Sequence, residues 1–304
     1  MPDTRSLLAP VRWLLAPATD EVRREQAYAA VFLRVLLGLM WLYNVVWKRP
    51  PDFGEDADKG LFHFTSFAVS DPVFPPYSWV VEHAVLPNIE VFGWLVLLVE
   101  TALAVLLVTG AWVRVAAALG VAQSVAIGLS VAFAPNEWPW SYWLMIGAHV
   151  VILFSSAGRV FAVDAVRARV GSARTLGLVW GAVAVVVGAY SVVASADEPL
   201  ARLGSGLAST DWSLSLGRYN LVGGLVLLVV GALVLVVARS QLAVLGWAAA
   251  AVGVAGAVSL YAQIGFSDPL LGGSATSAAF LLSVALVGGV MAHAGRRTSP
   301  GVAA

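Results

Sequence analysis

The stretch LPNIEVFGWLVLLVETALAVLLVTG, residues 86–110, decides the fold class of this chain. It holds about 20 largely apolar residues, and a helix of that length crosses the hydrocarbon core of a bilayer, which is about 30 Å thick. Seven further stretches share this character. We therefore predict an all-α, polytopic membrane protein with eight transmembrane helices. The predicted spans are 27–47, 88–109, 115–134, 141–157, 176–195, 220–238, 242–262 and 276–294.

The composition agrees with this class. Of the 304 residues, 60% are hydrophobic, 12% are charged and none is cysteine. Without cysteine the chain cannot form a disulfide, a thiolate nucleophile, an iron–sulfur cluster or a thiolate zinc site. The sequence therefore excludes every cysteine-ligated cofactor, and we expect neither a metal site nor a nucleic-acid partner.

The basic residues sort to one side of the predicted bundle. If the amino terminus is cytoplasmic, 12 arginines fall on the cytoplasmic side, and only Lys48, Arg49, Lys59, Arg202 and Arg218 fall outside. Cytoplasmic loops of membrane proteins carry an excess of Lys and Arg. We therefore predict an integral plasma-membrane protein with both termini in the cytoplasm.

The basic loop between the fourth and fifth spans divides the chain into two membrane domains. Residues 1–26 form a cytoplasmic amino-terminal segment, and residues 27–165 form a four-helix domain with a long extracytoplasmic loop, 48–87. Residues 166–304 form a second, apolar four-helix domain. Its many small residues predict close helix packing. Ionisable side chains well inside the spans occur only in the first domain.

One polar residue occupies each of the first four spans: Arg34, Glu100, Gln123 and His149. Counted at about 1.5 Å per residue, they fall at a similar depth. An isolated charge there costs at least ~2.5–3.5 kcal/mol, so we expect Arg34 and Glu100 to pair.

Three interpretations of this polar layer stay open. It is a structural ion pair that fixes helix packing, a proton-coupled catalytic site, or a transport pathway. In the catalytic interpretation Glu100 carries the proton, His149 is a second titrating group, and Arg34 sets their pKa values. For His149 a plain core role, bonded to Gln123 or to a carbonyl, is an alternative.

A second polar site lies at the outer mouth of the first span, in WLYNVVWKR (41–49). Its two cations either anchor the helix at the interface or hold an anion at the membrane surface. The outer aromatic residues either form an interfacial belt or line an entrance for a quinone. The candidate residues for binding a quinone or its anionic electron donor are Lys48, Arg49, Trp41, Tyr43, Trp79 and Trp140.

Three stretches resemble the DoxX/DoxD superfamily: 33–49, 86–120 and 141–165. The resemblance covers about residues 30–165. The matching features are Arg34 with Gly38, Pro87-Asn88 before Phe92-Gly93, Glu100, Gly110 with Arg114, and His149 before Gly158-Arg159 and Asp164. It implies a four-helix bundle, and its DoxD-like branch includes the small membrane subunit of thiosulfate:quinone oxidoreductase.

We therefore predict a membrane subunit of a quinone-linked oxidoreductase that passes electrons from a small sulfur anion to membrane quinone. Alternatives are a small-molecule or lipid transporter and a non-catalytic membrane scaffold or accessory protein. The expected cofactor is a quinone. A haem is disfavoured, because no second histidine shares the depth of His149. The expected partners are the lipid bilayer, the quinone and a soluble or membrane partner subunit.

Overall fold

The computed structural model of the protein describes residues 8–209 and 214–298. The described chain is helical except for its loops and one pair of two-residue antiparallel strands, β1 (Ala208–Ser209) and β2 (Leu214–Ser215). The prediction of an all-α chain is confirmed at this level. The first seven residues of the predicted cytoplasmic segment lie outside the described residues.

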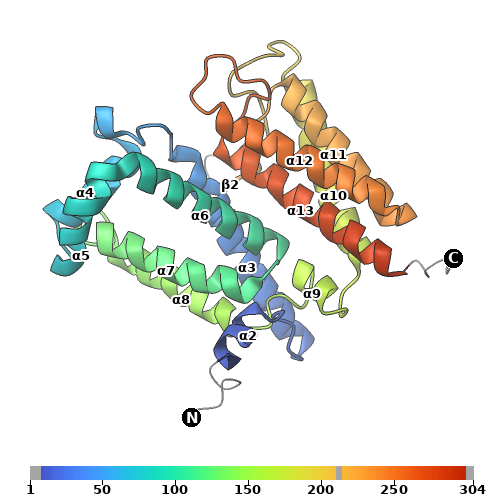
Figure 1. Ribbon diagram of the computed structural model, residues 1–304, viewed down its shortest axis with the longest axis horizontal. Coiled ribbons are helices and arrows are strands. Elements are labelled where there is room, and N and C mark those ends of the chain that lie inside the picture. The colour runs from blue at the N-terminus through green and yellow to red at the C-terminus, as the bar shows by residue number, and fades with distance from the viewer. Residues whose placement is uncertain (1–7, 210–213, 299–304) are drawn as a thin grey trace.

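The amino-terminal half is built around four helices that lie together in Figure 1: α3 (Arg24–Asn44), α6 (Ile89–Thr109), α7 (Val113–Val131) and α8 (Pro139–Leu153). Two short helices lie at one end of this group, α2 (Ala9–Leu15) and α9 (Val163–Arg167). The opposite end carries α4 (Gly60–Ser70), α5 (Pro75–Val80) and the short turns η1 (Val45–Trp47), η2 (Glu55–Ala57), η3 (Val81–Val85) and η4 (Leu86–Asn88).

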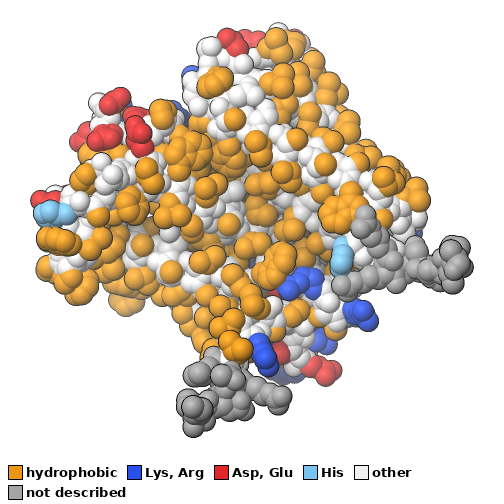
Figure 2. Space-filling view, viewed as in Figure 1, with side chains coloured by type: hydrophobic (Ala, Val, Ile, Leu, Met, Phe, Trp, Pro, Cys, Tyr) orange, Lys and Arg blue, Asp and Glu red, His pale blue; other side chains and the backbone are white. Residues whose placement is uncertain are grey.

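The two ends differ in charge. We call the end near α9 the basic end; it carries Arg114, Arg159 and Arg167. We call the end near α4 the acidic end; it carries Asp52, Glu55, Asp56 and Asp58. Figure 2 shows acidic side chains gathered near α4 and basic ones near α9. A broad apolar surface separates the acidic group from the basic group, as expected for helices that face lipid.

The carboxy-terminal half consists of α10 (Ala173–Ala194), α11 (Leu221–Ser240), α12 (Ala243–Ala262) and α13 (Ala275–Thr298). Glycines let these helices approach closely. A Cβ atom added at Gly188 would lie 2.8 Å from the backbone nitrogen of Leu228, and one added at Gly231 would lie 2.9 Å from the Cβ of Ala184. Neither site has room for a larger residue, so α10 and α11 pack backbone against backbone.

Within the part of the chain that the structure describes, seven helices are long and apolar enough to cross a membrane, which makes this a helical membrane protein. The predicted span 141–157 corresponds to α8, which has only 15 residues and ends at Leu153. At a rise of 1.5 Å per residue α8 is about 22 Å long, short of a hydrocarbon core of about 30 Å. The finding is thus seven long apolar helices and one shorter apolar helix, rather than eight equal spans.

The two halves meet along α13, the most enclosed of the seven long helices. It packs on α6 and contacts α3 as well as its neighbours α11 and α12. The Thr276 hydroxyl at its start donates a 3.0 Å hydrogen bond to the carbonyl oxygen of Leu42. Arg34, on α3, and His293, near the end of α13, both lie near α9, since Arg34 bonds to the loop before α9 and His293 shares a cavity with Arg167.

Candidate functional site

Glu100 forms a buried ion pair with Lys48. Its Oε2 lies 2.5 Å from Lys48 Nζ, and each side chain is only 1% exposed. Gln123 donates from Nε2 to Glu100 Oε1 over 3.2 Å, which links α7 to α6. Lys48 folds back along its own helix, where Nζ donates to the carbonyl oxygen of Asn44 over 3.1 Å and lies 3.7 Å from the ring centroid of Trp47. The carboxylate is therefore neutralised within the bundle.

The predicted pair of Arg34 with Glu100 is wrong. Arg34 lies at the basic end, where Nη1 donates to the carbonyl oxygen of Ala157 over 2.7 Å and Nη2 to that of Phe161 over 2.9 Å. Equal residue counts give equal depths only for helices that begin at one level and run with one tilt. Arg34 instead lies level with the loop that follows α8. Glu100 and Gln123 share a layer that does not include Arg34.

Asp164 organises the basic end. Its side chain is fully buried and accepts hydrogen bonds from the backbone nitrogens of Trp112 and Val113 over 3.1 and 3.0 Å. A carboxylate in this position caps the first turn of α7 and complements its dipole. Arg167 Nη1 donates to the same carboxylate over 2.6 Å. Sequence reasoning noted Asp164 only as part of the family resemblance and gave it no role.

His149 is a core residue with both ring nitrogens bonded. Trp41 Nε1 donates to His149 Nε2 over 2.9 Å, and His149 Nδ1 lies 2.8 Å from the carbonyl oxygen of Met145. Both bonds form together only when the proton is on Nδ1, which leaves the imidazole neutral. A Cβ added at Gly120 would lie 2.0 Å from His149 Cδ2, so α7 packs directly on the ring. The bond to a carbonyl fits the plain core role.

The six predicted quinone- or anion-binding residues do not form one site. Trp41 is fully buried against His149, and Lys48 is buried against Glu100, so neither lies at the outer mouth. The exposed ones are Tyr43, Arg49, Trp79 and Trp140. The protein also has a large cavity between its two halves, and none of the six residues lines it. The candidate ligand-binding site is therefore the cavity and not the outer mouth of the first span.

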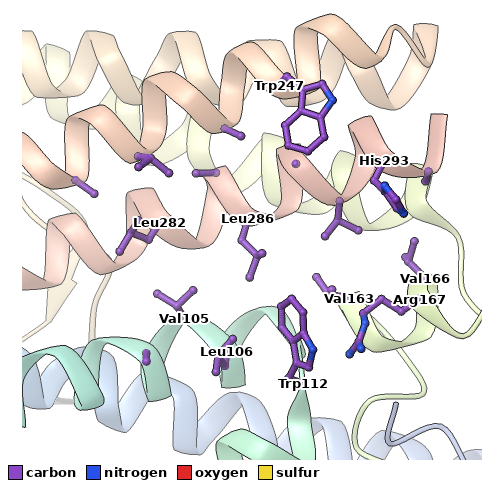
Figure 3. Close-up of a pocket in the computed structure, with 18 of the residues that line it drawn as sticks. Val105, Leu106, Trp112, Val163, Val166, Arg167, Trp247, Leu282, Leu286 and His293 are labelled. Atoms are coloured by element: carbon purple, nitrogen blue, oxygen red, sulfur yellow. The ribbon is translucent and has the colours of Figure 1, made fainter. Parts of the chain in front are cut away.

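A cavity of about 1430 Å³ lies between the two halves. Its walls come from α6 on one side and from α12 and α13 on the other, and α9 closes one end (Figure 3). Most of the lining is aliphatic, and Val105, Leu106, Leu282 and Leu286 are typical of it. A cavity of this size and character is suited to an apolar ligand with few polar groups.

Each end of the cavity carries polar groups. Thr101 and Tyr261 hydrogen-bond through their hydroxyls at one end, joining α6 to α12. Their mutual bond uses one of the two hydroxyl hydrogens, and the other takes no part in it. Arg167, Arg169 and His293 line the other end. Sequence reasoning missed Thr101 and Tyr261 because it searched the spans for ionisable groups, and neither hydroxyl is charged at neutral pH.

The fold and the cavity define a helical membrane protein with a large, mainly apolar cavity between its halves. Within the described residues no group of three or more His, Cys, Asp or Glu side chains is placed to hold a metal ion. No protein-family model matches the chain, and no curated protein or solved structure matches it either.

Proposed function

We propose that this protein is the membrane subunit of a quinone-linked oxidoreductase and that the quinone binds in the cavity between the halves. The observation that carries the proposal is an apolar cavity with the Thr101–Tyr261 hydroxyl pair at one end. An isoprenoid quinone has an apolar tail and a ring with carbonyl acceptors. The aliphatic walls would hold the tail and ring, and the free hydroxyl hydrogen would bond to a ring carbonyl.

The ion pair behind Thr101 supplies a proton-handling group for the same proposal. Reducing a quinone to a quinol takes up two electrons and two protons. Glu100 precedes Thr101 on α6, so the pair of Glu100 and Lys48 lies next to the hydroxyl end of the cavity. The electrons would come from a small sulfur anion through a soluble or membrane partner subunit, with Arg49 as an exposed cation at the acidic end.

The proposed topology places the basic end in the cytoplasm and counts α8 as an eighth crossing. The excess of arginine at that end supports this orientation. Arg34 on α3 and His293 near the end of α13 both lie near α9, at the basic end. An even number of crossings requires the first and last helices to have their outer ends on the same side of the membrane, and this placement agrees with that. The proposal also takes α3, α6, α7 and α8 as a DoxX-like bundle, supported by the sequence resemblance.

The test is quinone binding to the purified full-length protein. Titration with ubiquinone and menaquinone in mild detergent, read by tryptophan fluorescence and by mass spectrometry of retained lipid, should show saturable binding. Tyr261→Phe and Thr101→Val should each weaken it about two- to tenfold, the value of one neutral hydrogen bond. Tyr190→Phe, at an exposed tyrosine on α10, is the matched control. Absence of saturable binding, or an unchanged affinity in the double variant, would overturn the proposal.

A lipid transporter is the second candidate, because the far end of the cavity is basic. A cavity that joins an apolar wall to cationic groups is suited to an amphiphile with a negative headgroup. A scaffold, the third function considered, predicts binding of neither quinone nor headgroup. The quinone titration therefore separates the oxidoreductase from the other two, and a parallel titration with an anionic phospholipid separates the transporter from the scaffold.

A further inference from the structure

We infer that the basic end of the cavity binds the phosphate of one anionic phospholipid, whose acyl chains lie along α6 and α13. This headgroup site goes beyond the proposed function, because it uses the end of the cavity opposite the Thr101–Tyr261 pair, although the acyl chains would share the aliphatic walls with a quinone. The occupant is identified by its chemistry: one negative headgroup joined to two apolar chains.

Arg167 is held in place to present its guanidinium to the cavity. Nη1 donates to the buried carboxylate of Asp164, and the Cζ atom lies 4.6 Å from the ring centroid of Trp112. These two contacts fix the plane of the group and leave further N–H donors for a phosphate, which Arg binds well. Figure 3 shows Trp112 and Arg167 on one side of the cavity and His293 on the other.

The charge at this end is positive. Asp164 is the acid that faces Arg167, and it is also close enough to the buried Arg34 to interact electrostatically. Arg169 takes no part in the ion pairs of the described residues and is exposed. Two arginines thus share one carboxylate, and Arg169 adds a further positive charge. An anionic headgroup complements this arrangement.

The length of the apolar wall fits one leaflet. Leu282 and His293 both line the cavity and are 11 residues apart on α13, about 16 Å at 1.5 Å per residue. Half of a hydrocarbon core of about 30 Å is about 15 Å. A phospholipid with its phosphate near His293 and Arg167 would therefore run its chains to the middle of the membrane. There it would meet the hydroxyl end of the cavity.

Native mass spectrometry of the full-length protein tests this inference. Phosphatidylglycerol and phosphatidylcholine with identical chains are titrated into the protein in neutral detergent. We expect one phosphatidylglycerol to bind at least about fivefold more tightly than phosphatidylcholine, and Arg169→Gln to lose about fivefold, the value of one cation near a membrane surface. Arg239→Gln, an exposed arginine in the last turn of α11 outside the cavity, should bind like the wild type.

A second pair of variants tests the apolar wall. A Cβ added at Gly289 would lie 3.7 Å from Ala250 Cβ, an ordinary contact, so Gly289→Leu should fold and fill the cavity. It should abolish tight phosphatidylglycerol binding. Gly147→Leu, on α8 where a Cβ would meet nothing within 4 Å, should keep it.

Two results would overturn the inference: equal affinity for the two lipids, or equal losses in Arg169→Gln and Arg239→Gln. Equal affinity would mean that the protein does not recognise the charge of the headgroup, and equal losses would mean that bound lipid responds only to the overall charge of the basic end. Tyr261→Phe should leave phosphatidylglycerol binding unchanged. Failure of the phospholipid site and failure of the quinone site are therefore separate outcomes.

Discussion

The two halves of this molecule are held together by different interactions. Every ion pair among the described residues lies within residues 20–167; Lys48 and Glu100 are both buried, and the buried Asp164 pairs with the partly exposed Arg167. Helices also approach closely at glycines in this half, as at Gly38 and Gly120, whereas the described helices after residue 172 meet at glycines with no ion pair among them. Lipid tails are as apolar as leucine, so hydrophobic burial does not select helix partners in a membrane. Shape therefore contributes specificity in both halves, and buried charge adds to it only in the first.

The difference shows where function is located. Buried ionisable groups in a membrane are costly and by default indicate a functional site. The carboxy-terminal half offers a rigid apolar wall, and the amino-terminal half offers Glu100 beside Thr101 at one end of it and Asp164 with Arg167 at the other. The cavity combines the two halves, and neither would form it alone.

Breaking the Lys48–Glu100 pair should have the largest effect. Lys48→Met leaves a buried carboxylate without its cation, and Glu100→Gln leaves a buried ammonium without its anion. Removing one partner of a buried pair costs about 3–5 kcal/mol. We expect each single variant to lower the free energy of unfolding by about that amount, measured by denaturant titration in mild detergent with circular dichroism.

The double variant Lys48→Met/Glu100→Gln sharpens this prediction. With both charges gone, neither is left unpaired, so most of the lost stability should return. If the double variant loses as much free energy of unfolding as the two single variants together, the ion pair does not stabilise the amino-terminal half. Quinone binding in the stable double variant then shows whether the charges serve the site as well.

Asp164→Asn should have the next largest effect, about 3 kcal/mol. The neutral amide keeps the shape but weakens two backbone hydrogen bonds at the start of α7 and leaves Arg167 without its counter-ion. Asp20→Asn is the control, because Asp20 also pairs with an arginine, Arg114, but is 67% exposed. Thermal unfolding should shift clearly for Asp164→Asn and little for Asp20→Asn; equal shifts would contradict a special role for burial.

Gly231→Ala should have the smallest effect, about 1–2 kcal/mol of destabilisation, from overpacking against α10. The added methyl would lie 2.9 Å from both Ala184 Cβ and the backbone nitrogen of Val185. Gly147→Ala makes the same change where nothing lies within 4 Å, and there the better helix propensity of alanine should stabilise by up to about 1 kcal/mol. Opposite signs for the two variants, read as shifts in thermal unfolding, would confirm packing by shape; the same sign would refute it.

Most helix boundaries could be predicted from the sequence. The predicted span 88–109 differs from α6 by one residue, and 242–262 differs from α12 by one residue. The difference with the largest consequence is at 141–157, because α8 ends at Leu153, before Phe154, Ser155 and Ser156, and is too short to match the other crossings. The segment after α8 turns toward α3, where the carbonyl oxygen of Ala157 accepts a hydrogen bond from the guanidinium of Arg34. That end is set by a tertiary contact that composition does not report.

The sequence by itself determined that this is a helical membrane protein, that it has no cysteine chemistry, and that its buried charges lie in the first half. The absence of cysteine chemistry follows from composition alone, and the other two properties follow from the transfer free energy of each segment, which is local. Only the tertiary structure decided that Glu100 pairs with Lys48, that Arg34 belongs to the basic end, and that a cavity separates the halves. Which charged side chains pair depends on the offset and tilt of whole helices and on long side chains that fold back along them. The sequence of a single segment indicates neither.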